Sequence, residues 1–291
     1  MSHSGSFMRA RVATVAAVGL LGLLLTVGLA ACNSGPTTTT GLGSTSTTGT
    51  SASTSTSVVG LSHTTSTTGL PPSTTASSAA GGNTSGWPSR PSAEVVRHGP
   101  TDKKMIALTF DDNYQMPTAY ATLKVLEKYK VPATFFVIGH YVDTGPALAK
   151  AIAKGGFEVG DHTRSHANCT KLSKRGLRIE IGNGTDHYHA LTGAPIVRLF
   201  RPPGGFIDQK TVEVAGEKGF RYVVMWDIDT NDWRGHTAAQ ITDNVMGNAH
   251  NGAIVLMHVA AKHTAEALPG IITRLRKAGY QLVTVSTLLG M

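Results

Sequence analysis

The chain has 291 residues, of which 41% are hydrophobic, a formal net charge of +8 at pH 7 and only two cysteines. This composition excludes a small disulfide-stapled protein, and the basic excess is too weak and too scattered to predict nucleic-acid binding.

The first 31 residues have the pattern of a secretion signal. Two arginines precede an apolar run over residues 12–31. The run ends in Leu-Ala-Ala before Cys32, which resembles the lipobox of bacterial lipoproteins. This resemblance implies cleavage before Cys32 and lipidation of its thiol; an uncleaved anchor helix is the alternative. Both alternatives place the rest of the chain outside the cytoplasm, and a lipid anchor would hold it at the outer face of the bacterial cell membrane.

Residues 32–95 are predicted to be a disordered linker, because a stretch dominated by Ser, Thr and Gly cannot bury a core. Residues 96–291 are then the single catalytic domain, long enough for a sizeable core. This part stays mildly basic, which favours an anionic matrix such as a cell-wall polymer as its surroundings. We expect a monomer.

Apolar runs alternate with polar or amphipathic stretches through the predicted domain. Predicted strands are 105–110, 133–138, 157–160, 197–200, 221–228, 252–257 and 281–285. Predicted helices are 117–129, 145–154, 172–190, 208–218, 237–246 and 264–278, with a break expected at Gly182-Asn183-Gly184. Repeated βα units predict a parallel sheet, and about seven of them favour a distorted or incomplete (β/α)7-type barrel over a doubly wound sheet.

Two adjacent acids, Asp111 and Asp112, end the apolar run that begins at Ile106. Ligands gather at the carboxyl ends of parallel strands in α/β folds. Two carboxylates there are unfavourable unless something pairs with them, and a metal ion is the usual partner. A capping Asp followed by a solvated one is the alternative.

A second cluster, Asp161 to His166, directly follows the predicted strand 157–160. His162 and His166 are four residues apart, so one helical turn would place both imidazole rings on the same side. One carboxylate and two imidazoles with an open position are the ligand set of a catalytic divalent metal site.

Five motifs in order resemble the polysaccharide deacetylase family with its NodB-homology domain, carbohydrate esterase family 4. They cover about residues 103–286. The motifs are Thr109-Phe110-Asp111-Asp112, His162-Thr163-Arg164-Ser165-His166, Arg201-Pro202-Pro203-Gly204-Gly205, Asp229-Thr230-Asn231-Asp232-Trp233 and Leu256-Met257-His258.

The resemblance implies that Asp112, His162 and His166 bind a divalent metal. Zn²⁺ is the default for this set, and Co²⁺, Ni²⁺ and Mn²⁺ are alternatives. Asp111 would be the general base on the metal-bound water that attacks the acetamide, and His258 the acid that protonates the departing amine.

Five further residues have implied supporting roles. Asp232 would keep His258 charged, and Arg201 would orient Asp111. A backbone N–H near Gly204 would stabilise the oxyanion. Trp233 and Leu256 would wall the pocket for the acetyl methyl group.

Three positions depart from the family pattern. Asn113 stands where Gly is common, and Asn tolerates a positive φ there. Gly204 replaces a common Tyr, which removes one side-chain wall of the groove. Val259 follows His258 where an acid is often found. The last two changes bear on substrate choice more than on metal binding.

The leading hypothesis is metal-dependent removal of N-acetyl groups from an extracellular N-acetylglucosamine polymer, with peptidoglycan first among the candidates. Chitin-like oligomers, an exported polysaccharide and xylan O-acetyl groups are alternatives with the same chemistry. A catalytically silent carbohydrate-binding protein on the same fold is a second hypothesis. A glycoside hydrolase using Asp111 with Asp229 or Asp232 is a third, in which the histidine pair would be idle.

Overall fold

The structure, a computed structural model, describes residues 86–291. The predicted signal segment, Cys32 and the predicted linker up to residue 85 lie outside the described residues. Among the described helices, none has the length and apolar character needed to cross a membrane.

The described residues form a nine-stranded sheet in which every strand pair is parallel, with helices between the strands. The strands are β1 (Glu94–Val96), β2 (Met105–Asp111), β3 (Thr134–Val137), β4 (Glu158–Asp161), β5 (Leu199–Phe200), β6 (Tyr222–Val224), β7 (Ile228–Asp229), β8 (Ile254–His258) and β9 (Gln281–Val283). The α-helices are α1 (Pro117–Tyr129), α2 (Gly139–Thr144), α3 (Pro146–Lys154), α4 (Lys174–Glu180), α5 (Asn183–Thr192), α6 (Gln209–Glu217), α7 (Ala238–Asn248), α8 (Thr264–Lys277) and α9 (Val285–Leu288).

The sheet curls into an open barrel. Its strand order is β1-β6-β5-β4-β3-β2-β8-β7, with β9 beside the first residues of β2. The chain passes from β6 to β7 through residues 225–227, a reach of at most about 14 Å. In a flat sheet these strands would lie about 29 Å apart, so the sheet must curl back on itself. The predicted incomplete barrel is confirmed.

Strand β2 pairs with three other strands of this sheet, β3, β8 and β9. All its residues except the first are buried, as expected for a parallel strand covered on both faces. Its side chains alternate: Ile106 and Leu108 belong to the outer core, whereas Ala107 belongs to the inner one. The same alternation turns Thr109 and Asp111 toward the barrel interior, with Asp111 at the carboxyl end.

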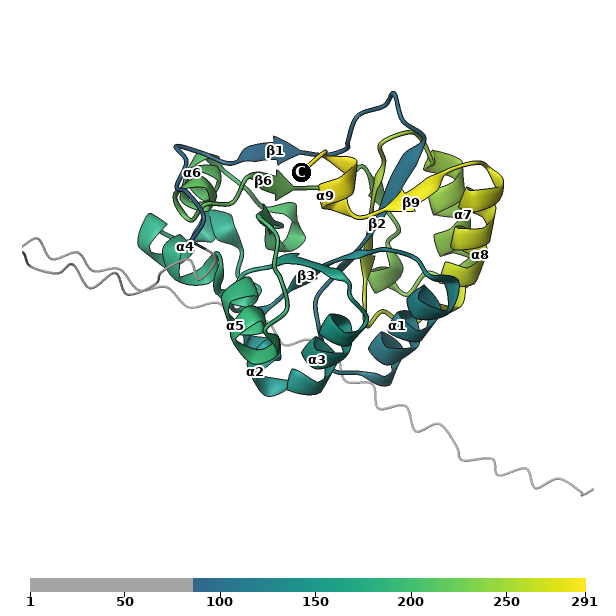
Figure 1. Cartoon of the computed structure of the whole chain (residues 1–291), viewed down its shortest axis with the longest axis horizontal. Helices are drawn as coiled ribbons and strands as arrows, with labels where there is room; N and C mark the ends of the chain where they lie inside the picture. Colours follow the sequence, from purple (N-terminus) through teal and green to yellow (C-terminus); the bar gives the residue numbers. More distant parts are fainter. Residues whose placement is uncertain (1–85) are drawn as a thin grey trace, which may run out of the picture. The chain divides into compact units, whose positions relative to one another are not determined.

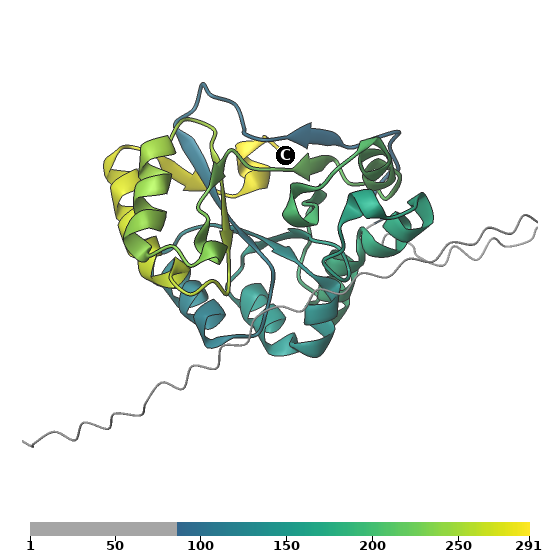
Figure 2. The same ribbon diagram turned by 180° about the vertical axis from the view of Figure 1, so that it is seen from behind.

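Helices cover the outside of the barrel. Helices α7 and α8 lie side by side, and α1 lies next to α8 (Figures 1 and 2). The short helix α9 lies at the end opposite the carboxyl ends of the strands. There Val285 N donates to Thr134 Oγ1 at 2.9 Å and Ser286 N to Glu158 Oε1 at 3.1 Å, at the first residues of β3 and β4.

Several predicted elements need correction. The predicted helix 172–190 divides into α4 and α5, and the predicted break is confirmed because Gly182 has φ of 89°. The predicted strand 221–228 divides into β6 and β7, and the strand predicted over 281–285 ends at Val283, where α9 follows. Strand β1 and helices α2 and α9 were not predicted from the sequence.

The packed part of the chain begins before the predicted boundary at residue 96. Strand β1 pairs with β6, and the ring of Trp87 lies 5.4 Å from that of Phe220. These residues carry no long apolar run, so the sequence pattern grouped them with the polar linker.

Candidate active site

A pocket of about 490 Å³ lies at the carboxyl ends of the strands. Its lining residues are Asp111, Asp112, His162, His166, Gly204, Trp226, Asp229, Trp233, Arg234, Leu256 and His258. All the sequence-predicted site residues of the domain line it except Arg201 and Asp232, which are buried and contact the lining from behind.

Arg201 is fully buried in the barrel and holds Asp111. Its Nη1 donates to Asp111 Oδ1 at 2.7 Å and to Thr109 Oγ1 at 2.8 Å. The other guanidinium nitrogens donate to the backbone oxygens of Val224 and Met225. Burial raises the pKa of the Asp111 carboxyl, but the charge of Arg201 and nearby imidazoles outweighs burial, and the pKa lies below its usual value. Asp111 therefore stays ionised, as a general base must.

Replacing Arg201 by glutamine is expected to lower the free energy of unfolding by about 3–5 kcal/mol, because it leaves the buried Asp111 charge without its partner. Urea denaturation followed by circular dichroism measures this loss. Arg274→Gln is the matched control: its pair with Asp243 is exposed, so the loss should stay below about 1 kcal/mol. Equal losses in the two variants would contradict the structural role of the buried pair.

Asp112, His162 and His166 place one ligand atom each within 4.8 Å of one another. His166 Nε2 lies 3.6 Å and His162 Nε2 3.9 Å from Asp112 Oδ1. A tetrahedral site with bonds of about 2.1 Å spaces its ligand atoms by about 3.4 Å. Asp112 Oδ1 is buried and has no hydrogen-bond partner, and burial raises the pKa of this carboxyl to about 7. These residues fit a divalent cation, which would supply the missing partner.

The two imidazoles are suited to act as ligands. Nδ1 of His162 lies 2.7 Å from the backbone oxygen of Arg201, which can only accept, so Nδ1 carries the proton and Nε2 faces the cluster. Burial lowers the pKa of His162 to about 4 and also lowers that of His166. Both rings are thus neutral near pH 7, the state that binds metal.

The expected helical turn from His162 to His166 is wrong. The segment is a loop in which Thr163 has φ of 68° and His166 φ of 62°, neither of which is helical. Glu180 fixes the outer part of this loop, because its carboxylate accepts hydrogen bonds from Arg164 N and Ser165 N at 3.0 and 2.8 Å. The rings still meet, with centroids 5.1 Å apart.

Asp161 fixes the inner part of the same loop and was missed as a site residue. Its buried carboxylate accepts from the backbone N–H groups of Thr163, Gly182 and Thr185 at 3.0–3.1 Å. It therefore ties the ligand loop to the first turn of α5. Its position directly before His162 was the signal that could have identified it.

Asn113 does not take the expected positive φ; Asp112 does, with φ of 68°. Asp tolerates this region better than most residues. Asn113 is instead fully buried, and its Oδ1 accepts from Ile138 N at 2.9 Å. The side chain thus joins the end of β2 to the residue after β3.

His258 is held on the other side of the pocket by Asp232. Asp232 Oδ1 lies 2.8 Å from His258 Nδ1, and its Oδ2 accepts from His258 N and from Thr264 Oγ1 at 2.8 and 2.6 Å. Burial lowers the pKa of His258, but the Asp232 carboxylate and the other acids outweigh it and raise the pKa to about 9. His258 is therefore protonated near pH 7, with Nε2 left to serve as a proton donor. Thr264 carried no sequence signal.

The two family departures near the pocket have structural explanations. Gly204 has φ of 61°, and a Cβ atom there would lie 2.7 Å from the Phe206 ring, so this ring takes space beside the backbone. Val259 is fully buried in the outer core, where an acid would lack water. Trp233 and Leu256 line the pocket.

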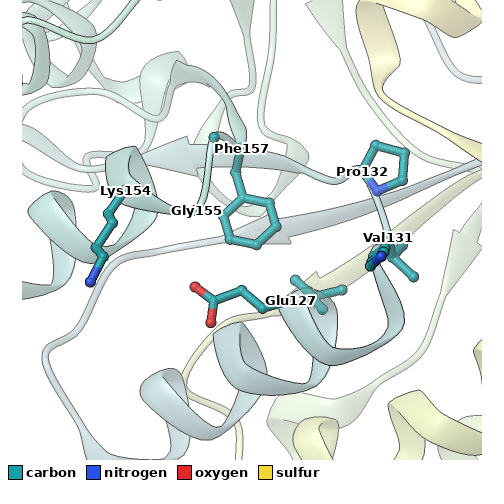
Figure 3. Close-up of a pocket in the computed structure, with 9 residues that line it drawn as sticks. Glu127, Val131, Pro132, Lys154, Gly155 and Phe157 are labelled. Carbon is teal, nitrogen blue, oxygen red and sulfur yellow. The ribbon is translucent and has the colours of Figure 1, made fainter.

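A second hollow lies at the other end of the barrel, between the ends of α1 and α3 (Figure 3). Phe157 points into it, with Glu127 and Lys154 at its rim. Its lining contains no histidine, cysteine or other group suited to metal binding beyond the one carboxylate. We assign the chemistry to the strand-end pocket.

An open parallel barrel with a candidate metal-ligand cluster, a carboxylate held by an arginine and an imidazole held by an aspartate in one pocket has the arrangement of a hydrolase active site. The comparisons with known proteins agree. The profile of the Polysaccharide deacetylase family matches residues 98–223. A peptidoglycan-N-acetylglucosamine deacetylase of Bacillus cereus is 37% identical over 203 residues, which are 68% of this chain and 94% of that protein.

Two solved structures have the same fold. A peptidoglycan N-acetylglucosamine deacetylase is 33% identical, with a TM-score of 0.64 over 68% of this chain and 93% of that one. A CE4 family pseudoenzyme from Bacillus anthracis is 32% identical, with a TM-score of 0.64 over 68% of this chain and 69% of that one. The chain belongs to the polysaccharide deacetylase family, carbohydrate esterase family 4, and is a hydrolase of that class.

Proposed function

We propose that the protein removes N-acetyl groups from N-acetylglucosamine residues of peptidoglycan. One observation carries the proposal: Asp111, Asp112, His162, His166 and His258 converge on a single pocket, where Arg201 holds Asp111 and Asp232 holds His258. Relatives named as peptidoglycan deacetylases support the substrate. Chitin-like oligomers and xylan O-acetyl groups present the same reacting bond and are the alternative substrates.

In this proposal Asp112, His162 and His166 hold a divalent cation, with Zn²⁺ as the default and Co²⁺, Ni²⁺ or Mn²⁺ as alternatives. When bound, such an ion acidifies water to a pKa of about 7 and polarises a carbonyl oxygen. Asp111, kept ionised by Arg201, takes a proton from the attacking water. His258 gives its Nε2 proton to the departing amine nitrogen.

The remaining residues shape the site. The Gly204 N–H is the proposed donor to the oxyanion, since Gly204 lines the pocket. Leu256 and Trp233 wall the space for the acetyl methyl group. Asp232 acts through His258 and does not touch the substrate, because it is buried and hydrogen-bonded on both oxygens.

The two other hypotheses fit the site less well. A glycoside hydrolase that paired Asp111 with Asp232 is disfavoured because Asp232 is committed to His258 and Thr264. A pairing of Asp111 with Asp229, which also lines the pocket, would leave the metal-ligand cluster idle. A silent carbohydrate-binding protein has a precedent in the pseudoenzyme relative, but it would need neither the Asp111–Arg201 pair nor the Asp232–His258 pair.

Mass spectrometry of muropeptides and chitooligosaccharides after incubation with the protein tests the proposal. The expected product is lighter by one acetyl group per site at unchanged chain length, and a chelator should abolish its formation until metal is restored. Shortened chains would instead indicate a glycoside hydrolase. Glycan binding without acetate release, across several metals, would support the silent protein.

We also propose that the mature chain begins at Cys32, is lipidated there and acts as a monomer at the outer face of the membrane. The lipobox-like sequence supports this placement. Labelled palmitate should appear in the mature chain and be lost in Cys32→Ser; a labelled Cys32→Ser chain would contradict the anchor.

A further inference from the structure

Arg234 stands on a rigid turn at the pocket. The turn, Asp232–Arg234, lies between Asn231 and Gly235, which have φ of 53° and 79°. The backbone N–H of Arg234 donates to the backbone oxygen of Asn231 at 3.0 Å, and that of Gly235 donates to the backbone oxygen of Asp232 at 3.1 Å. Because Asp232 is itself fixed by His258 and Thr264, the backbone of Arg234 is positioned by the same contacts that hold the catalytic histidine.

The guanidinium of Arg234 lines the pocket and lies 4.6 Å from the centre of the Trp233 ring. This cation–π contact places the guanidinium over the ring without using its N–H donors. In residues 86–291 no carboxylate pairs with Arg234, whereas Arg178 and Arg274 each pair with one. Arg234 is thus a cation with free donors, held at the edge of the site.

A guanidinium with this exposure suits a carboxylate, which its planar fork can bind with two hydrogen bonds. The candidate polymers differ in this respect: chitin-like chains are neutral, whereas the N-acetylmuramic acid units of peptidoglycan carry a lactyl group that ends in a carboxylate when no peptide is attached. We propose that Arg234 binds a carboxylate on the sugar next to the one deacetylated, which makes an acidic, muramic-acid-containing glycan the preferred substrate class. This inference rests on the proposed function and adds a substrate-reading residue to it.

The test compares two forms of one oligosaccharide of alternating N-acetylglucosamine and N-acetylmuramic acid, one with free lactyl carboxylates and one with these groups methyl-esterified. The intact protein should prefer the free acid by about 10-fold in kcat/KM, mainly through KM. Arg234→Gln should reduce this preference to about 2-fold or less, and Arg234→Lys should keep part of it. The preference should also weaken at high ionic strength.

Arg175→Gln is the matched control, because Arg175 is exposed on α4 and outside the pocket lining, and this variant should keep the preference. An unchanged preference in Arg234→Gln would overturn the inference. An equal loss of kcat/KM in Arg234→Gln on the free-acid and the esterified form would also overturn it, because Arg234 would then only support the Trp233 ring. A third form of the oligosaccharide carries the peptide on the lactyl group. A preference for this form that depends on Arg234 would overturn the sugar carboxylate as the ligand and indicate a carboxylate of the peptide. Absence of acetate release from every form by the intact protein would instead refute the proposed function.

Discussion

Asp112→Ala is expected to lower acetate release at least about 1,000-fold and to abolish tight binding of a divalent metal. The variant removes the only carboxylate among the three converging ligand groups of the described residues. The loss corresponds to about 4 kcal/mol of transition-state stabilisation, in the range that metal assistance supplies. Isothermal titration with Zn²⁺ and an acetate assay measure the two effects.

This variant should still fold. Asp112 Oδ1 is buried without a hydrogen-bond partner, so removing the carboxylate in the metal-free protein takes away a desolvated polar group, which offsets the cost of placing alanine at a φ of 68°. Asp243→Ala is the matched control, because this acid is exposed on α7. Zn²⁺ binding of unchanged affinity in Asp112→Ala would show that the metal site lies elsewhere.

Asp232→Asn is expected to move the alkaline limb of the activity profile toward acid pH by about 2 units or more. In the intact protein His258 has a pKa of about 9, so it keeps the proton that the leaving amine needs up to that pH. The amide lacks the charge that raises this pKa, and burial then brings the pKa to the usual value of about 6.5 or below. The rate at pH 8 should fall by about 10-fold or more.

The pH dependence of kcat/KM on a chitooligosaccharide measures this shift. Glu266→Gln is the matched control, because Glu266 faces His263 at 2.8 Å outside the pocket lining, so the limb should stay in place. An alkaline limb that stays near pH 9 in Asp232→Asn would mean that another group is the proton donor.

The sequence predicted which residues meet but not how the chain brings them together. The motifs follow strand ends, and parallel strands place their carboxyl ends at one side, so Asp111, Asp112 and the histidines could be grouped from strand positions alone. The backbone path from His162 to His166 could not be predicted in this way. It depends on Glu180, which lies in α4 and binds the loop, and on Asp161, which binds backbone N–H groups at the start of α5.

Buried polar contacts between segments distant in sequence could not be predicted from the sequence either. Thr264 donates to Asp232 across 32 residues, and Arg201 reaches carbonyl groups 23 and 24 residues away. Asn113 was assigned to a turn on its residue type, whereas its side chain satisfies the backbone of Ile138. These hydrogen-bond partners are determined by tertiary packing, so they cannot be predicted from local sequence propensity.

Strand β2 also determines when the protein can finish folding. One of its edges pairs with β8, and the other is shared by β3 and β9. Two of these three neighbours come from the last part of the chain, so β2 keeps open edges until nearly the whole sequence has been synthesised. Closing contacts this distant in sequence is slow. Strand β2, which ends in Asp111, is thus synthesised before most of the other strands but is among the last to have both edges paired.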